Sequence, residues 1–353
     1  MRIAQVSPLY ESVPPQFYGG TERVVAYLTD ALVEAGHDVT LFASAEACTR
    51  ARLVPVRDQA IRLDPAELKS DLAAHLSMLH EVRQRIDDFD VVHFHVDMVH
   101  FPLFADRAAQ TLTTLHGRLD LKDLAGAYRR WPRFPLVSIS DRQREPLRNA
   151  SWIGTVHHGL PSSLCPFSPE GRGGYLAFLG RISPEKRVDR AIEIAQRAGL
   201  PLRIAAKVDP VDRAYFHDVI EPLLAAPGIE YIGEIGDADK GAFLGNALAL
   251  LFPIDWPEPF GLVMIEAMSC GTPVVGWRCG SVPEVLDDPA AGRIVESMDA
   301  AVAAVVDVIA LDRRAVRDVF ERRFTAQTMA RSYIELYRRL CETPLSGVRA
   351  VHA

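Results

Sequence analysis

Short runs of β-forming apolar residues alternate with helical patterns along most of this 353-residue chain. Consecutive apolar positions are typical of strands that are buried on both faces of a parallel sheet. The alternation stops at a proline- and glycine-rich segment, residues 159–174, and then starts again. We therefore expect an α/β protein with two doubly wound parallel sheets. The expected strands are Arg2–Val6, Val39–Phe42, Val91–His95, Thr111–Leu115, Leu136–Ile139, Trp152–His157, Tyr175–Leu179, Leu202–Ala206, Glu230–Ile232, Ala249–Phe252 and Pro273–Gly276.

The chain length and an apolar fraction of 48% suit two domains with full cores. We interpret residues 159–174 as a linker that contains the domain hinge, because their prolines and glycines suit a linker more than a packed element. The predicted division is an N-terminal domain at 1–160, a C-terminal domain at 161–324, a final helix at 325–341 and a disordered tail at 342–353.

Charge and cysteine content exclude several classes of protein. The formal net charge of -7, with both signs interspersed, argues against nucleic-acid binding, which needs a basic face. No signal peptide or transmembrane run is visible, so we expect a cytoplasmic protein. Five scattered cysteines without CxxC spacing predict neither a disulfide framework nor a zinc site.

The segment from Glu258 onward predicts a loop, a helix, a helix stop and a strand. We expect the helix to begin near Gly261 and to end at Gly271. Leu262 and Glu266 then share one helical face, so first-turn amides and a carboxylate can line the same pocket. Such amides suit a diphosphate, and the carboxylate suits ribose hydroxyls. The alternative is that Glu258 is a solvated loop acid and Glu266 a helix-surface charge, which is the favoured interpretation for an acidic pair in general. The apolar neighbours of Glu266 reverse that preference for Glu266 alone.

A second cluster of polar residues directly follows the strand expected at 175–179. Ser183 is a good N-cap and Pro184 a good first helical residue, which would place Lys186 in the first turn of a helix. A cation there indicates an anionic ligand, since the helix dipole alone disfavours it. Arg181 would then bind two phosphate oxygens. A pair of surface basic residues remains the alternative.

The N-terminal half contributes glycines and histidines. Gly19 and Gly20, in the first strand-to-helix loop, would let the backbone approach a ligand, although taken alone they favour a simple turn. His116 ends a strand before a glycine and can reach a sugar hydroxyl. His93 and His95 lie on one strand face, where structural packing is favoured over metal binding because no third ligand appears.

These residues resemble glycosyltransferase family 4, the retaining enzymes of GT-B fold, from Arg2 to about Leu340. Glu258 and Glu266 resemble the E-x7-E motif of that family. Residues 180–186 resemble its Arg/Lys diphosphate clamp, and residues 19–20 its glycine loop. The resemblance implies two Rossmann-like domains that face each other across a cleft, with the C-terminal helix crossing back to the N-terminal domain.

The same resemblance implies a set of site residues. Arg181, Lys186, Glu258 and His116 would be catalytic: the two cations would stabilise the leaving diphosphate, Glu258 would hold donor-sugar hydroxyls, and His116 would face the donor sugar. Glu266 would bind the ribose. The full donor-binding set is Gly19, Gly20, Phe260, Gly261, Leu262, Glu266 and Ile235.

The implied reaction transfers a hexosyl group with retention from a UDP- or GDP-linked sugar to the hydroxyl of a sugar, lipid or metabolite. It needs no metal or other cofactor, since cations and helix amides can offset the diphosphate charge. Three alternatives stay open: a glycosyl phosphorylase, a nucleotide-sugar epimerase, or a non-enzymatic sugar-nucleotide binding module.

The acceptor side is the least specific part of the sequence. Residues 128–134 mix basic and aromatic side chains, which would suit an anionic acceptor or peripheral contact with a membrane surface. A plain surface helix end is the favoured interpretation.

Overall fold

The computed structural model describes residues 1–16 and 19–342 and divides them into two compact units. Unit 1 consists of Met1–Ile139, Arg144–His157 and the chain from Ala326 onward, and unit 2 of Ser140–Gln143 and His158–Thr325. The tail predicted at 342–353 lies, beyond residue 342, outside the described residues.

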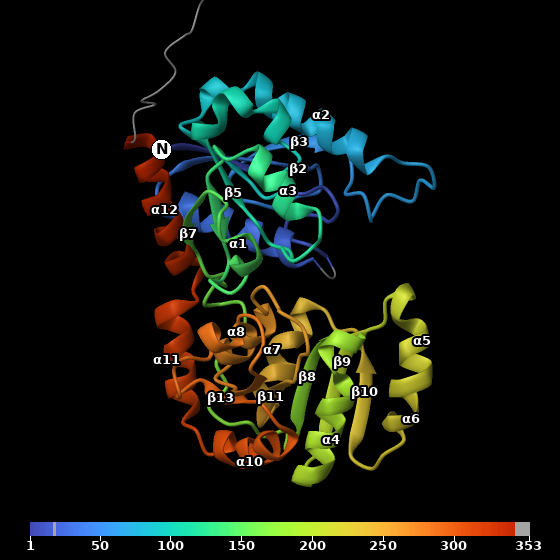
Figure 1. Cartoon of the computed structure of the whole chain (residues 1–353). Helices are drawn as coiled ribbons and strands as arrows, with labels where there is room; N and C mark the ends of the chain where they lie inside the picture. The colour runs from blue at the N-terminus through green and yellow to red at the C-terminus, as the bar shows by residue number, and fades with distance from the viewer. Residues whose placement is uncertain (17–18, 343–353) are drawn as a thin grey trace, which may run out of the picture. The chain divides into compact units, whose positions relative to one another are not determined.

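The sheet of unit 1 has seven strands in the described residues, in the order β3-β2-β1-β4-β5-β6-β7 (Figure 1). All pairings are parallel, as the apolar runs predicted. The direction of winding reverses between β1 and β4, so the loops after these strands diverge and leave room for a ligand. The strands are β1 (Arg2–Val6), β2 (Asp38–Ser44), β3 (Arg52–Arg57), β4 (Val91–Phe94), β5 (Thr111–Thr114), β6 (Leu136–Ser138) and β7 (Trp152–Thr155).

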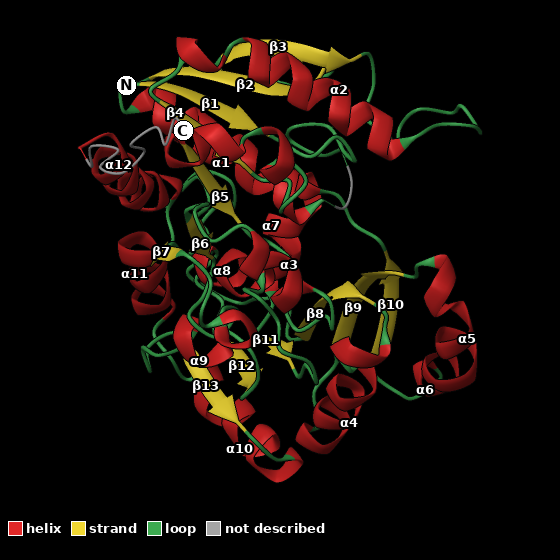
Figure 2. Ribbon diagram, turned by 45° about the horizontal axis from the view of Figure 1, so that its top comes forward, coloured by secondary structure: helices red, strands yellow, loops and turns green. Residues whose placement is uncertain are grey.

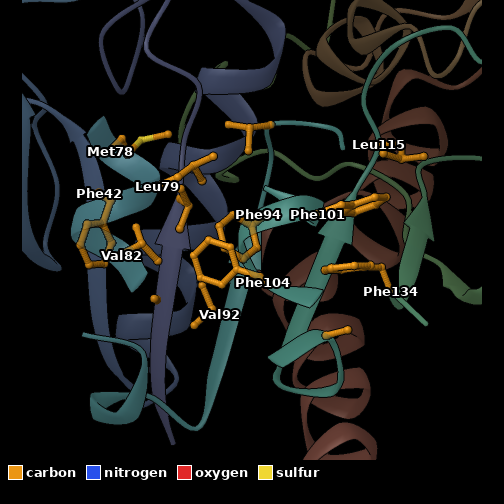
Figure 3. Packing of buried hydrophobic residues seen from close by; sticks show 14 of the residues in the cluster. Phe42, Met78, Leu79, Val82, Val92, Phe94, Phe101, Phe104, Leu115 and Phe134 are labelled. Atoms are coloured by element: carbon orange, nitrogen blue, oxygen red, sulfur yellow. The ribbon is translucent and has the colours of Figure 1, made fainter. Parts of the chain in front are cut away.

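The helices of unit 1 are α1 (Gly20–Glu34), α2 (Asp71–Gln84), α3 (Leu124–Arg130) and α12 (Ala326–Glu342). Aromatic side chains dominate one core of this unit (Figure 3). Phe101 and Phe134 stack with ring centroids 4.1 Å apart, and Phe94 meets Phe104 edge to face at 4.9 Å. These offset and edge contacts hold the loops after β4 and β5 against the sheet.

The sheet of unit 2 has six parallel strands in the described residues, in the order β10-β9-β8-β11-β12-β13. The direction of winding reverses between β8 and β11. The strands are β8 (Leu176–Arg181), β9 (Leu202–Lys207), β10 (Ile229–Gly233), β11 (Ala249–Phe252), β12 (Val274–Trp277) and β13 (Gly292–Val295).

Helices cover both faces of the sheet in unit 2, and Figure 2 shows the helices of both units in red around the yellow strands. On one face α4 and α10 contact each other, and α10 also contacts β11, β12 and β13. α8 contacts α7 and α11 on the other face. These helices are α4 (Val188–Ala198), α7 (Asp237–Asn246), α8 (Leu262–Ser269), α10 (Met298–Ile309) and α11 (Arg313–Arg323), with the short α5 (Arg213–Tyr215), α6 (Glu221–Leu224) and α9 (Val282–Val285) in addition.

The last helix, α12, belongs to unit 1 although unit 2 precedes it in the chain. It contacts α1 and β7. A Cβ atom on Gly154 of β7 would lie 3.2 Å from a methyl carbon of Leu336, and the rings of Tyr333 and Tyr337 are buried. The chain therefore returns to its N-terminal unit, as the resemblance implied.

Residues 159–174, interpreted from the sequence as a linker, pack as part of unit 2. Leu160 is fully buried, and the guanidinium of Arg313 donates a hydrogen bond of 2.8 Å to the carbonyl oxygen of Ser168. A Cβ on Gly171 would lie 2.6 Å from a backbone oxygen. Glycine here permits close packing, which the sequence cannot distinguish from the chain freedom of a linker.

Candidate active site

The carboxyl edge of the sheet in unit 2 brings most of the predicted site residues together. Arg181 is the last residue of β8, Lys186 lies in the turn that follows, and Glu258 lies in the loop after β11. β8 and β11 are the neighbours between which the winding reverses. Open α/β sheets bind ligands at such a switch point.

Lys186 and Glu258 form an ion pair in which both side chains are mostly buried, with exposed fractions of 16% and 13%. The indole nitrogen of Trp256 donates a second hydrogen bond, of 3.0 Å, to the same carboxylate oxygen of Glu258. The ammonium nitrogen of Lys186 also lies 5.0 Å from the ring centroid of Trp256. A carboxylate and an aromatic face thus hold this cation in place.

The turn that carries Lys186 differs from the predicted helix start. Residues 184–186 form a single 3-10 turn, Arg187 adopts a left-handed conformation with φ 56°, and α4 begins only at Val188. Ser183 makes no side-chain capping hydrogen bond. The prediction that Lys186 lies in the first turn of an α-helix was wrong, because the left-handed Arg187 interrupts the helical backbone.

Hydrogen bonds to carbonyl groups hold the loop that carries Glu258. The backbone N–H of Ser281 donates to the Glu258 carbonyl at 3.0 Å, and its hydroxyl donates to the Phe260 carbonyl at 2.7 Å. The hydroxyl of Ser140 donates to the Pro259 carbonyl, also at 2.7 Å. This loop is therefore ordered before any ligand arrives.

α8 begins one residue after Gly261 and stops at Ser269, so it is shorter at both ends than expected. Gly261 has φ 81°, and a Cβ there would lie 2.9 Å from the methyl carbon of Met264. Its first turn contains no acidic side chain, which leaves the positive end of the helix dipole available to an anion. Gly271 has φ 82° just beyond the helix, as a left-handed stop requires.

Glu266 lies on the buried side of α8, with only 4% of its surface exposed. Its carboxylate lies 3.4 Å from the ammonium nitrogen of Lys240 on α7, which also pairs with Asp237 at 3.0 Å. Sequence reasoning missed Lys240, because one lysine on an amphipathic helix gives no signal by itself. Ile235 is half-buried in the loop between β10 and α7.

Three carboxylates surround the guanidinium of Arg181. Its nitrogen atoms lie 2.6 Å from Glu185, 3.3 Å from Asp209 and 3.8 Å from Asp212. Desolvation of the Glu185 carboxyl is outweighed by a backbone hydrogen bond and by the ion pair with Arg181, which together hold its pKa below the usual value. Desolvation raises the pKa of Asp212. A phosphate group that binds Arg181 therefore has to compete with these acids.

The remaining predicted residues, Gly19, Gly20 and His116, lie in unit 1 and line one pocket of about 560 Å³. The pocket lies at the switch point between β1 and β4. Its lining residues are Pro8, Tyr10, Gly19, Gly20, Thr21, Glu22, Arg62, Asp71, Leu72, His75, His95, Val96, Asp97, Val99, His116 and Gly117.

Gly19 precedes α1 in an extended conformation, with φ -178°. A Cβ at this position would lie 2.8 Å from the Cβ of Pro15 and 3.2 Å from a side-chain carbon of Glu11. The lack of a side chain thus allows the loop to close onto residues 11–15, a use of glycine that differs from the predicted approach to a ligand.

His116 is bound to His95 by a hydrogen bond of 2.9 Å between its Nε2 atom and Nδ1 of His95. Desolvation lowers the pKa of His116 to about 3, so its ring is neutral at physiological pH. His93 and His95 have ring centroids 4.1 Å apart. His93 is hydrogen-bonded to the buried Tyr337, and His95 to the buried Gln5. Within residues 1–16 and 19–342, no group of three or more possible ligands could hold a metal ion.

The aromatic residues at 128–134 face the interior of unit 1. Tyr128 and Phe134 are buried, and Trp131 lies 5.9 Å from the ring of Phe101. The arginines at 129 and 130 stay exposed. The segment therefore packs Tyr128 and Phe134 inward, leaves Trp131 half-buried and turns its arginines to solvent.

All five cysteines are free. In the described part of the chain, no helix is long and apolar enough to cross a membrane.

Two family models match the chain and together span most of it. The model described as Glycosyltransferase Family 4 matches residues 18–183, and the model described as Glycosyl transferases group 1 matches residues 168–322.

Known proteins with similar sequences are named as glycosyltransferases. The chain is 28% identical to a glycogen synthase from Mycobacterium tuberculosis, over 96% of this chain and 94% of that protein. It is 26% identical to a phosphatidyl-myo-inositol mannosyltransferase from Mycolicibacterium smegmatis, over 89% and 86% of the two chains. Among solved structures, a glycosyltransferase involved in avilamycin A biosynthesis has a TM-score of 0.71 and 25% identity, over 96% of this chain and 98% of that one. With its two parallel-sheet α/β units, the chain belongs to the glycosyltransferases of family 4, which have the GT-B fold.

Proposed function

We propose that this enzyme transfers a hexosyl group, with retention of configuration, from a UDP- or GDP-linked sugar to an acceptor hydroxyl. The observation that carries this proposal is the Lys186–Glu258 pair at the switch point of unit 2, next to the N-terminus of α8. A cation, free helix amides and a carboxylate at one edge are the groups that a sugar diphosphate needs.

The diphosphate would bind between Lys186, Arg181 and the first-turn amides of α8. Lys186 is mostly buried, which strengthens the interaction of its side chain with phosphate. Arg181 would exchange at least one of its carboxylate partners for a phosphate oxygen. Glu266, further along α8, would accept hydrogen bonds from the ribose hydroxyls, and Phe260, Gly261, Leu262 and Ile235 would contact the nucleotide.

The sugar would be held by Glu258, whose carboxylate already accepts hydrogen bonds from Lys186 and Trp256. Once a diphosphate draws the ammonium group of Lys186 toward itself, carboxylate lone pairs become available to sugar hydroxyls. Lys186 would thus bind the diphosphate of the donor, and its ion-pair partner Glu258 would bind the sugar.

In the reaction, the bond between the anomeric carbon and the diphosphate oxygen breaks, and a new bond forms from the acceptor oxygen on the same face. The acceptor proton passes to the departing phosphate oxygen. The negative charge that develops on the diphosphate is offset by Lys186, Arg181 and the α8 amides, so the proposal requires no metal ion.

The acceptor would bind in the pocket of unit 1. Its volume of about 560 Å³ suits one or two sugar-sized groups, and carboxylates, histidines and the ring of Tyr10 line it. His116 and the loop at Gly19 and Gly20 form part of the same lining.

The test is a transfer assay with UDP- and GDP-hexoses in EDTA, on a panel of sugar and polyol acceptors. We expect product only with an acceptor present, and NMR of the product should show the anomeric configuration of the donor. An inverted product would contradict retention, and loss of activity in EDTA would contradict metal independence. Product formed from free phosphate instead would indicate a phosphorylase.

A further inference from the structure

A chain of buried polar side chains crosses the interior of unit 1 from the C-terminal helix to the pocket. Gln5 comes from β1, His93 from β4, Thr114 from β5 and Tyr337 from α12, and His95 follows β4. The exposed fraction of each is 3% or less. Buried polar groups are costly unless they are hydrogen-bonded, so the positions of these side chains are strongly constrained.

Three hydrogen bonds lead from His116 to α12. His116 Nε2 lies 2.9 Å from His95 Nδ1, and His95 Nε2 lies 2.9 Å from the amide oxygen of Gln5. The amide nitrogen of Gln5 donates to the hydroxyl of Tyr337 at 3.1 Å.

The amide oxygen of Gln5 fixes the proton positions along this path. An amide oxygen only accepts, so His95 has its proton on Nε2. A neutral imidazole carries one N–H, so Nδ1 of His95 is an acceptor and Nε2 of His116 is the donor between the two rings. His116 is then the neutral Nε2–H tautomer, with the lone pair on Nδ1.

A second branch is consistent with the same directions. The Tyr337 hydroxyl accepts a hydrogen bond from the amide nitrogen of Gln5 and can donate one to Nδ1 of His93, 2.8 Å away. Nε2 of His93 lies 2.7 Å from the hydroxyl of Thr114, which in turn lies 2.9 Å from the hydroxyl of Tyr333. The contacts from Gln5 through Tyr337 and His93 to Thr114 can therefore all form with these proton positions.

We propose that His95 and Gln5 are positioning residues, which hold His116 in the Nε2–H tautomer and in one ring orientation for sugar transfer. Tyr337 completes the arrangement by orienting the amide of Gln5. The inference rests on the proposed role of His116 in the transfer reaction. It gives the C-terminal helix a function at the pocket of unit 1, through Gln5 and Tyr337, which are not in the pocket lining, and His95, which is.

The first test measures the tautomer directly in the full-length wild-type enzyme. With 15N-labelled histidine, long-range proton–nitrogen correlations distinguish protonated from unprotonated ring nitrogens, and a His116→Gln variant assigns the signals. We expect His116 to show a protonated Nε2 and an unprotonated Nδ1. A proton on Nδ1 would overturn the proposal. This measurement needs no activity, so its failure is distinct from a failure to transfer sugar.

The second test reverses the hydrogen bonds with Gln5→Glu. A carboxylate at this position favours a protonated His95, whose Nδ1–H then donates to His116 and moves the His116 proton to Nδ1. We expect this tautomer change together with a loss of roughly tenfold in kcat, the size of one hydrogen bond, at little cost in donor KM. An unchanged tautomer and kcat in the folded variant would overturn the proposal.

Tyr333→Phe provides the matched control. Tyr333 is a fully buried tyrosine on the same helix, and its hydrogen-bond partner Thr114 lies on the branch that passes through His93. We expect this variant to lose some stability but to keep the wild-type tautomer and a kcat within about twofold of wild type. A loss of kcat as large as that of Gln5→Glu would show a merely structural effect and would overturn the proposal.

Discussion

The carboxylate of Glu258 is paired with the ammonium group of Lys186, a residue 72 positions earlier in the chain. Strands β8 and β11, neighbours in the sheet, bring the two together. The pair forms before any donor is bound, so the enzyme holds its main cation close to where a diphosphate would need it.

Lys186→Ala should abolish measurable donor binding and lower kcat by at least about a hundredfold, because a mostly buried charge opposite the leaving group is lost. Titration calorimetry and initial-rate kinetics measure the two effects. Arg203→Ala is the control, since Arg203 pairs with Glu230 in an exposed position of the same unit. Equal losses in both variants would mean that Lys186 has no special role.

Lys240→Met should destabilise the protein by about 2 kcal/mol, because the buried carboxylate of Glu266 loses the cation beside it. Urea unfolding measures this change. The double variant with Glu266→Gln should recover part of the loss, since the buried side chain at position 266 is then neutral. Strictly additive effects would contradict an interaction between the two side chains.

Gly280→Ala should disturb the loop that carries Glu258. A Cβ at this position would lie 2.3 Å from the backbone nitrogen and 2.4 Å from the oxygen of Glu258, and φ is 52°. We expect weaker donor binding in addition to lower stability. Gly199→Ala is matched to it, with φ 68° but no atom within 4 Å, and should cost only about 1 kcal/mol of stability. Equal donor binding in both variants would argue against a tightly held loop.

Glu22, in the lining of the unit 1 pocket, gives a prediction for pH. Burial raises the pKa of its carboxyl from 4.5 to about 6, so the folded state binds the proton more tightly than the unfolded state. Stability is therefore lost as the pH rises from about 4.5 through about 6. Glu22→Gln should be more stable than wild type by up to about 2 kcal/mol at pH 7 and by nothing below pH 4.5. Urea unfolding at both pH values checks this, and a difference independent of pH would contradict it.

Most strands of the two sheets could be predicted from the sequence because buried parallel strands leave continuous apolar runs. The strands that were missed, β3 and β13, lie at the edges of their sheets. β3 contains Pro55 between two arginines, and β13 begins with Gly292 and Arg293, so neither has the composition of a buried strand.

The candidate site was predictable where spacing along one element fixed the geometry, as for Glu266 on α8. Partners from other elements were not, because a single Lys240 or Gln5 gives no pattern in sequence. The environment of His116 depends on α12, more than 200 positions away, and only the fold brings the two together.

Titration calorimetry of the wild type, Lys186→Ala and Glu266→Ala with UDP-, GDP- and ADP-hexoses in EDTA measures whether unit 2 binds a nucleotide-diphosphate sugar without a metal. We expect one UDP- or GDP-linked sugar to bind well above the others and both substitutions to abolish its binding. Absence of binding by every nucleotide sugar, or unchanged affinity in the two variants, would contradict this expectation.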